Sequence, residues 1–90
     1  MLSDVKLALR IATDDFDSEL NNLIAAAYLD LKIAGVTEQD KTDPLIKTAV
    51  ITYCKMHFGE PDEYDRLKRS YDEQKAQLSM ATGYTTWPEA

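Results

Sequence analysis

Two side chains that can do chemistry stand close together in the sequence, Cys54 and His57. Three positions separate them, so on a helix they lie about one turn apart and offer a thiol and an imidazole to the same face. A zinc site needs three or four ligands, and these are the only cysteine and the only histidine of the chain. A nucleophilic cysteine needs a base that a third group orients, and no such group is suitably spaced. We therefore expect a structural cysteine and a histidine at a helix end.

A second pattern, Asp15-x-Asp17-x-Glu19, is spaced like the start of a calcium-binding EF-hand loop. The match then fails, because the sixth position is Leu20 where glycine is needed and the twelfth is Ala26 where glutamate is needed. Capping of a helix explains the acids better, and the widely separated glycines form no phosphate-binding loop. The sequence thus predicts a protein that is not an enzyme, with no catalytic, cofactor-binding or metal-binding residues and no cofactor.

Length and charge narrow the classes of function further. The chain has 90 residues, enough for one domain, and a formal net charge of −6. Nine acids and four bases fall in residues 1–45, which disfavours non-specific binding to phosphates. A single cysteine forms no intramolecular disulfide and fits a reducing cytoplasm. We expect no signal peptide, and the absence of a long apolar run predicts no membrane span.

The periodicity predicts an all-α fold, a small bundle of four main helices with short loops and an irregular C-terminal tail. The first helix is expected over 3–11 with Ser3 as its N-cap, and the second after a cap at Asp14 or Asp15, ending at Gly35. The third begins after Asp43 and ends near residue 58, and the fourth spans about 62–80. We assign 1–80 to a single helical adaptor domain and 81–90 to a tail, equally a free tail or a docking arm.

The third predicted helix is apolar over most of its circumference, apart from a polar strip that includes Thr48, Thr52 and Lys55. A helix of this kind is covered on several sides, so it is either central in its own domain or partly covered by a neighbouring subunit. The fourth helix has a narrower apolar stripe that contains tyrosines, and the tail is unusually aromatic. The candidate contacts with another subunit or with a portal protein are Tyr64, Leu67, Tyr71, Tyr84 and Trp87.

Several stretches together resemble the phage head–tail connector proteins, which are often labelled DNA-packaging proteins in tailed-phage genomes. The residues that carry the resemblance are the openings of the first three predicted helices and two short motifs around the fourth. Each stretch alone is a common pattern at the start or end of a helix, but the order and spacing of the stretches over about residues 2–84 are fairly specific. The stretches are 2–11, 14–20 with 23–27, 43–50, 58–61 and 69–72.

The resemblance implies a helical adaptor that assembles into a homo-oligomeric ring, dodecameric in the virion, beneath the portal protein. It would join the DNA-filled head to the tail, or to the next connector or tail-completion protein, after synthesis in the host bacterial cytoplasm. DNA would pass through the ring without specific binding, and no membrane would be involved. The family offers no catalytic residues to carry over, and residues 83–90 are its least family-like part.

An acidic ring around a DNA path would keep the DNA from sticking, because like charges repel. We therefore expect the acids of residues 14–19 or those of residues 60–65 to face the channel. The alternative function is that of a small helical regulatory protein which binds DNA or another regulator. The candidate channel-facing acids are Asp14, Asp15, Asp17, Glu19, Glu60, Asp62, Glu63 and Asp65.

Overall fold

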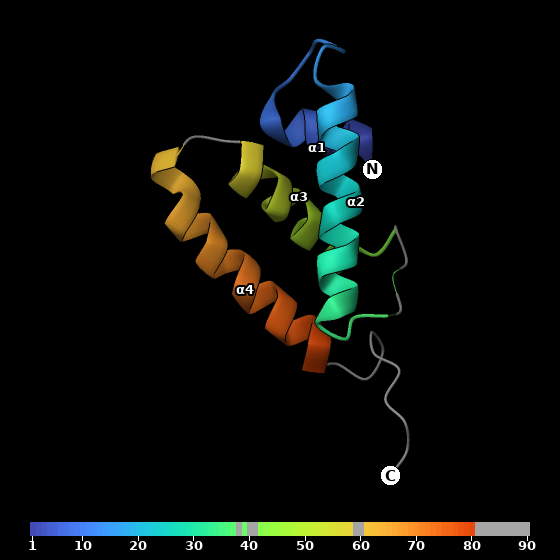
Figure 1. Cartoon of the computed structure of the whole chain (residues 1–90), viewed down its shortest axis with the longest axis vertical. Coiled ribbons are helices and arrows are strands. Elements are labelled where there is room, and N and C mark those ends of the chain that lie inside the picture. The colour runs from blue at the N-terminus through green and yellow to red at the C-terminus, as the bar shows by residue number, and fades with distance from the viewer. Residues whose placement is uncertain (38, 40–41, 59–60, 81–90) are drawn as a thin grey trace.

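A computed structural model describes residues 1–37, 39, 42–58 and 61–80 of the chain. In this part the regular elements are α1 (Leu2–Leu9), α2 (Asp17–Ile33), α3 (Pro44–Phe58), a 3-10 turn η1 (Pro61–Glu63) and α4 (Tyr64–Met80). Figure 1 shows α3 between α2 and α4, with the short α1 across one end. The predicted all-α fold with four main helices is confirmed. The predicted tail, 81–90, lies outside the described residues.

The apolar helix α3 is the central element of the domain. It packs against α4 and α2 and, less extensively, against α1. Thr52, expected in a polar strip, is instead buried, because its hydroxyl donates a hydrogen bond to the Thr48 carbonyl oxygen within the helix at 2.9 Å. Of the two expected ways to cover α3, the structure shows cover by the chain's own helices.

The core forms where the apolar stripes of the four helices meet. Each fully buried aliphatic side chain contributes roughly 1.5–3 kcal/mol by leaving water, and this is the main favourable term for a domain so small. The buried side chains of α2 recur at intervals of three and four residues along one face of the helix, and α4 contributes two buried side chains. The buried apolar residues are Val5, Leu20, Ile24, Ala27, Leu31, Val36, Ile46, Ala49, Val50, Cys54, Met56, Tyr71 and Leu78.

Two helix ends follow the predicted local chemistry. The Asp43 carboxylate accepts hydrogen bonds from the backbone N–H groups of Leu45 (2.8 Å) and Ile46 (3.4 Å), so Asp43 caps α3 as expected. Gly35 has φ of +101°, a conformation that glycine adopts readily, and it follows the end of α2 at Ile33. Both predictions are confirmed.

Two predicted N-caps are wrong. The helix α1 begins at Leu2 with Met1 as its N-cap, so Ser3 lies inside its first turn. The helix α2 begins at Asp17 after Phe16, whose side chain makes no capping bond. Asp14 does not cap because its carboxylate bonds the Lys6 ammonium at 2.8 Å, an interaction that a local pattern does not reveal.

None of the helices in the described part of the chain is long and apolar enough to cross a membrane.

Candidate functional site

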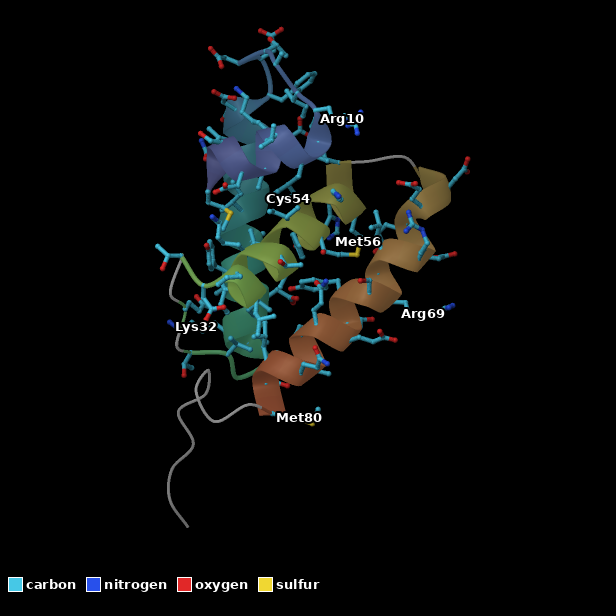
Figure 2. The ribbon with its side chains drawn as sticks, turned by 180° about the vertical axis from the view of Figure 1, so that it is seen from behind. Arg10, Lys32, Cys54, Met56, Arg69 and Met80 are labelled. Atoms are coloured by element: carbon cyan, nitrogen blue, oxygen red, sulfur yellow. The ribbon has the colours of Figure 1, made fainter. Side chains whose placement is uncertain are left out.

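A groove lies where α1 ends, α3 ends and α4 begins, and we call it the basic groove. Its volume is about 580 Å³, and it is open to solvent along one side. Figure 2 shows Arg10 reaching out from the end of α1 on the side where α4 begins. The lining residues are Ala8, Leu9, Arg10, Lys55, Phe58, Glu63, Arg66 and Leu67.

The basic groove combines an apolar floor with an excess of positive charge. Arg10, Lys55 and Arg66 contribute cations and Glu63 the one acid among its lining residues. Arg66 bonds the Glu63 carboxylate at 3.1 Å, so this pair is internally neutralised. Within the described residues, Arg10 and Lys55 make no side-chain hydrogen bond or ion pair. These two cations stand out in a chain with net charge −6, and positive charge of this kind attracts anionic groups.

The backbone at Arg10 is strained. Its φ of 59° and ψ of 41° are left-handed, a conformation that costs a residue with a side chain roughly 1–2 kcal/mol and that glycine adopts freely. Its N–H closes α1 by bonding the Leu7 carbonyl oxygen at 3.2 Å, and the next N–H, of Ile11, bonds the Lys6 carbonyl oxygen at 2.9 Å. Glycine is the usual residue at such a helix end. Arginine is less stable in this conformation, and here its side chain places a cation at the groove.

Residues 13–19, which include the first turn of α2, are rich in acids, and we call them the acidic loop. One side of it is held by Lys6, which lies 2.8 Å from the Asp14 carboxylate and 2.9 Å from that of Asp17. The hydrogen bond from Lys6 lowers the pKa of Asp14. Asp15 and Glu19 are exposed, and their carboxylates have no ion-pair partner in the described part of the chain. The acidic loop therefore carries two free negative charges.

Residues 1–85 match the family described as phage connector protein. The chain belongs to this phage connector family. The match covers nearly the whole length and confirms the resemblance found in the sequence. No curated protein and no solved structure matches the chain. The family assignment thus rests on the family match, and the geometry shows which surfaces this member presents.

The predicted contact residues of this connector-family chain are placed very differently. Tyr64 is exposed at the start of α4, where its ring lies 6.2 Å from that of His57, and Leu67 is half-buried at the basic groove. Tyr71 is 2% exposed and packs within the chain. Tyr84 and Trp87 lie outside the described residues. The structure thus brings Leu67, and not Tyr71, to an open surface.

Tyr71 is held at the junction of α2 and α4 by a group of polar contacts. Its hydroxyl donates a hydrogen bond to the Asp30 carboxylate at 2.6 Å, and the Lys75 ammonium lies 3.2 Å from the same carboxylate. Burial, and then the hydrogen bond to Asp30, raise the pKa of Tyr71 well above its ordinary value. Its ring meets that of Tyr53 edge-on, with centroids 5.3 Å apart. We call Asp30, Tyr71 and Lys75 the Tyr71 cluster.

The predicted channel-facing acids lie toward one end of the molecule, around the start of α2 and the start of α4 (Figure 1). Two of them, Asp14 and Asp17, are paired with Lys6, and Glu63 is paired with Arg66. Glu60 lies outside the described residues. The exposed acids that make no ion pair within the described ranges are Asp15, Glu19, Asp62 and Asp65.

The pair with the best prospects for chemistry, Cys54 and His57, does not form a reactive site. Cys54 is fully buried, and burial raises the pKa of its thiol to about 11, so it stays protonated and a poor nucleophile near neutral pH. The His57 ring packs against Tyr53, with centroids 4.4 Å apart. Among the described residues, no three His, Cys, Asp or Glu side chains are grouped to hold a metal ion.

The two cations of the basic groove were not predicted as site residues. Lys55 is expected only in the polar strip of the third helix, and Arg10 is given no role. Three separate helices bring the groove together, so no local spacing marks it. No local pattern marks Arg10 either, because only some helices place a left-handed residue after the last turn.

Proposed function

We propose that the chain is a structural head–tail connector of a tailed phage or prophage. Copies of it assemble side by side as a ring beneath the portal protein and join the DNA-filled head to the tail. Its partners are other copies of the chain, the portal, and the next connector or tail-completion protein, and its place is the virion. The family match over residues 1–85 is the observation that carries this proposal.

The surface of the single chain supports a role in contacts. A ring needs two different complementary patches on each subunit, because the contact runs head to tail around the ring. The basic groove and the acidic loop are two such patches of opposite charge. Several large apolar side chains also remain outside the core, which favours further contacts. They are Leu7, Leu29, Ile33, Leu45 and Met80, each more than half exposed.

The charge of the chain supports passage of DNA without capture. Asp62 and Asp65 are exposed near the start of α4 and pair with no cation among the described residues. We propose that acids of this segment face the DNA path, where repulsion from phosphates keeps the duplex moving. Basic residues in their place would add phosphate contacts and make binding dependent on salt.

One observation supports the alternative function, a small regulator that binds DNA. The cations Arg10 and Lys55 make no ion pair within the described residues. Net charge −6 works against it, since non-specific affinity for DNA comes from clustered Lys and Arg. A gel-shift assay of the isolated protein with duplex DNA at low salt separates the two functions. We expect no shift, and a shift that high salt abolishes would favour the regulator.

Deleting the gene from its phage or prophage tests the proposed function. We expect heads that package DNA but carry no tail, and tails that stay unattached, with both defects restored by the gene supplied in trans. A deletion that leaves normally tailed, infectious particles would contradict the proposal. Peptide mass spectrometry of wild-type particles provides a second readout, because a connector remains in the virion and a regulator does not.

A further inference from the structure

Among the described residues, no acidic side chain pairs with Arg10 or Lys55 in the basic groove. Arg10 and Lys55 stand over a floor that includes Leu9, Phe58 and Leu67, and neither cation meets a described carboxylate. An apolar floor lowers the local dielectric constant, so an anion bound there is attracted more strongly than at an open surface. The groove is therefore suited to a short acidic segment, which supplies carboxylates to the cations and covers the apolar floor.

The chain itself carries a segment of this chemistry, the acidic loop. Asp15 and Glu19 are exposed and unpaired within the described residues, while Lys6 holds Asp14 and Asp17 in place. The loop is therefore fixed in shape, and its binding requires little ordering. The connection between α1 and α2, which contains the loop, lies toward the same end of the molecule as the groove (Figure 1).

Within one copy the two charge sets do not meet. The loop lies beside the groove, where the Phe16 ring contacts that of Phe58 edge-on with centroids 5.3 Å apart, and Lys6 pairs with Asp14. Asp15 and Glu19 form no ion pair with Arg10 or Lys55 of the same chain. Within the described residues these complementary charges stay unpaired, which favours a contact with another copy of the chain.

We propose that the acidic loop of one copy docks into the basic groove of the next, with Asp15 and Glu19 facing Arg10 and Lys55. The two patches differ, so the contact is directional and each copy keeps one groove and one loop for its two neighbours. This inference rests on the proposed function in that copies of the chain assemble together. It assigns Asp15 and Glu19 to the lateral contact, and leaves Asp62 and Asp65 for the DNA path.

Charge reversal on each side tests the contact. The groove variant carries Arg10→Glu and Lys55→Glu, and the loop variant carries Asp15→Lys and Glu19→Lys. Each variant alone sets like charges against each other, so we expect self-association at least about tenfold weaker than that of the unaltered chain. Mixed in equal amounts, the two variants restore complementary charges at every contact. We expect association to return in the mixture, with both variants present in equal proportion.

Lys32→Glu with Arg69→Glu is the matched control. It changes the net charge as the groove variant does, but both residues are exposed and lie away from Arg10 (Figure 2). We expect the control to self-associate like the unaltered chain, because its groove and its acidic loop are unchanged. Circular dichroism checks that every variant is folded. If a double variant is unfolded, the single changes Lys55→Glu and Asp15→Lys replace it.

Light scattering after size-exclusion chromatography, at low salt and up to about 1 mM protein, gives the masses. Normal self-association of either charge variant would overturn the inference, and so would a 1:1 mixture that stays monomeric. The proposed function is judged separately. If the contact fails this test while the gene deletion still yields tailless heads, the chain is a connector that assembles through another surface.

Discussion

The Tyr71 cluster and the basic groove both place charged groups beside buried apolar side chains, but they leave those charges in opposite states. In the Tyr71 cluster the Asp30 carboxylate accepts a hydrogen bond from the Tyr71 hydroxyl and pairs with Lys75. In the basic groove Arg10 and Lys55 have no partner within the described residues. A satisfied cluster contributes to the stability of one chain, whereas unsatisfied cations contribute only when a second molecule supplies the anion.

This difference separates the residues that hold the monomer together from those that we propose join it to others. Changes in the Tyr71 cluster should alter the free energy of unfolding. Changes in the basic groove should alter association and leave the monomer as stable as before, or more stable.

Tyr71→Phe should produce the largest effect on the monomer. It removes the hydroxyl that bonds Asp30 at 2.6 Å while keeping the ring, so we expect a loss of about 1–2 kcal/mol in the free energy of unfolding. Urea denaturation followed by circular dichroism measures it. Tyr64→Phe is the control, because Tyr64 is exposed, and it should change stability by less than about 0.5 kcal/mol. Equal losses in both variants would show that the hydrogen bond to Asp30 contributes little.

Alkaline pH should lower the free energy of unfolding of the monomer. Burial raises the pKa of Cys54 to about 11, so the unfolded chain loses the thiol proton first as pH rises from about 9. Stability is complete below that pH and then falls by up to about 1.4 kcal/mol per pH unit for each such group. Tyr71, whose pKa is also raised, adds to the fall above about pH 10.

Urea midpoints from pH 8 to 10.5 measure this dependence. Cys54→Ala should flatten the first part of the fall, between about pH 9 and 10. Lys55→Gln, in the basic groove, should leave the profile unchanged in this range. A profile that stays flat to pH 10.5 in the unaltered chain would contradict the assignment to buried groups.

Arg10→Gly should have the smallest effect on the monomer and the opposite sign. Glycine adopts the left-handed conformation at the end of α1 without strain, so we expect a gain of about 1 kcal/mol in the free energy of unfolding. The same change removes one cation from the groove and should weaken self-association. A thermal melt and a light-scattering titration of one sample measure both. A variant that is more stable and also associates normally would exclude Arg10 from the contact.

Local chemistry in the sequence was enough to predict the four helices, the start of α3 after Asp43 and the Gly35 end. These features depend on neighbours within one or two turns of helix. The caps at Ser3 and at Asp14 or Asp15 were predicted wrongly. Met1 is the N-cap of α1 and Phe16 that of α2, and Lys6 bonds the Asp14 carboxylate. Contacts between helices decided both the burial of Tyr71 and the assembly of the basic groove, and periodicity carries no information about which helices meet.

The fate of Tyr71 illustrates that limit. Its spacing in α4 placed it on the apolar stripe, but the same stripe suits a helix docked on its own domain and a helix that contacts a neighbour. The carboxylate of Asp30, forty-one positions earlier, accepts the hydrogen bond from the Tyr71 hydroxyl that holds Tyr71 inside the chain. Burial and a long-range partner thus decide between two interpretations of the stripe, of which the sequence favoured the helix docked on its own domain.

Cryo-electron microscopy of the particle that carries this chain tests the central claim most directly. We predict a ring of the four-helix domain between portal and tail, in which residues 13–19 of each copy contact the groove around Arg10 and Lys55 of the next. A head–tail junction without density for the four-helix domain would contradict the proposed function. A ring joined through another surface would keep the connector and reject the loop-to-groove contact.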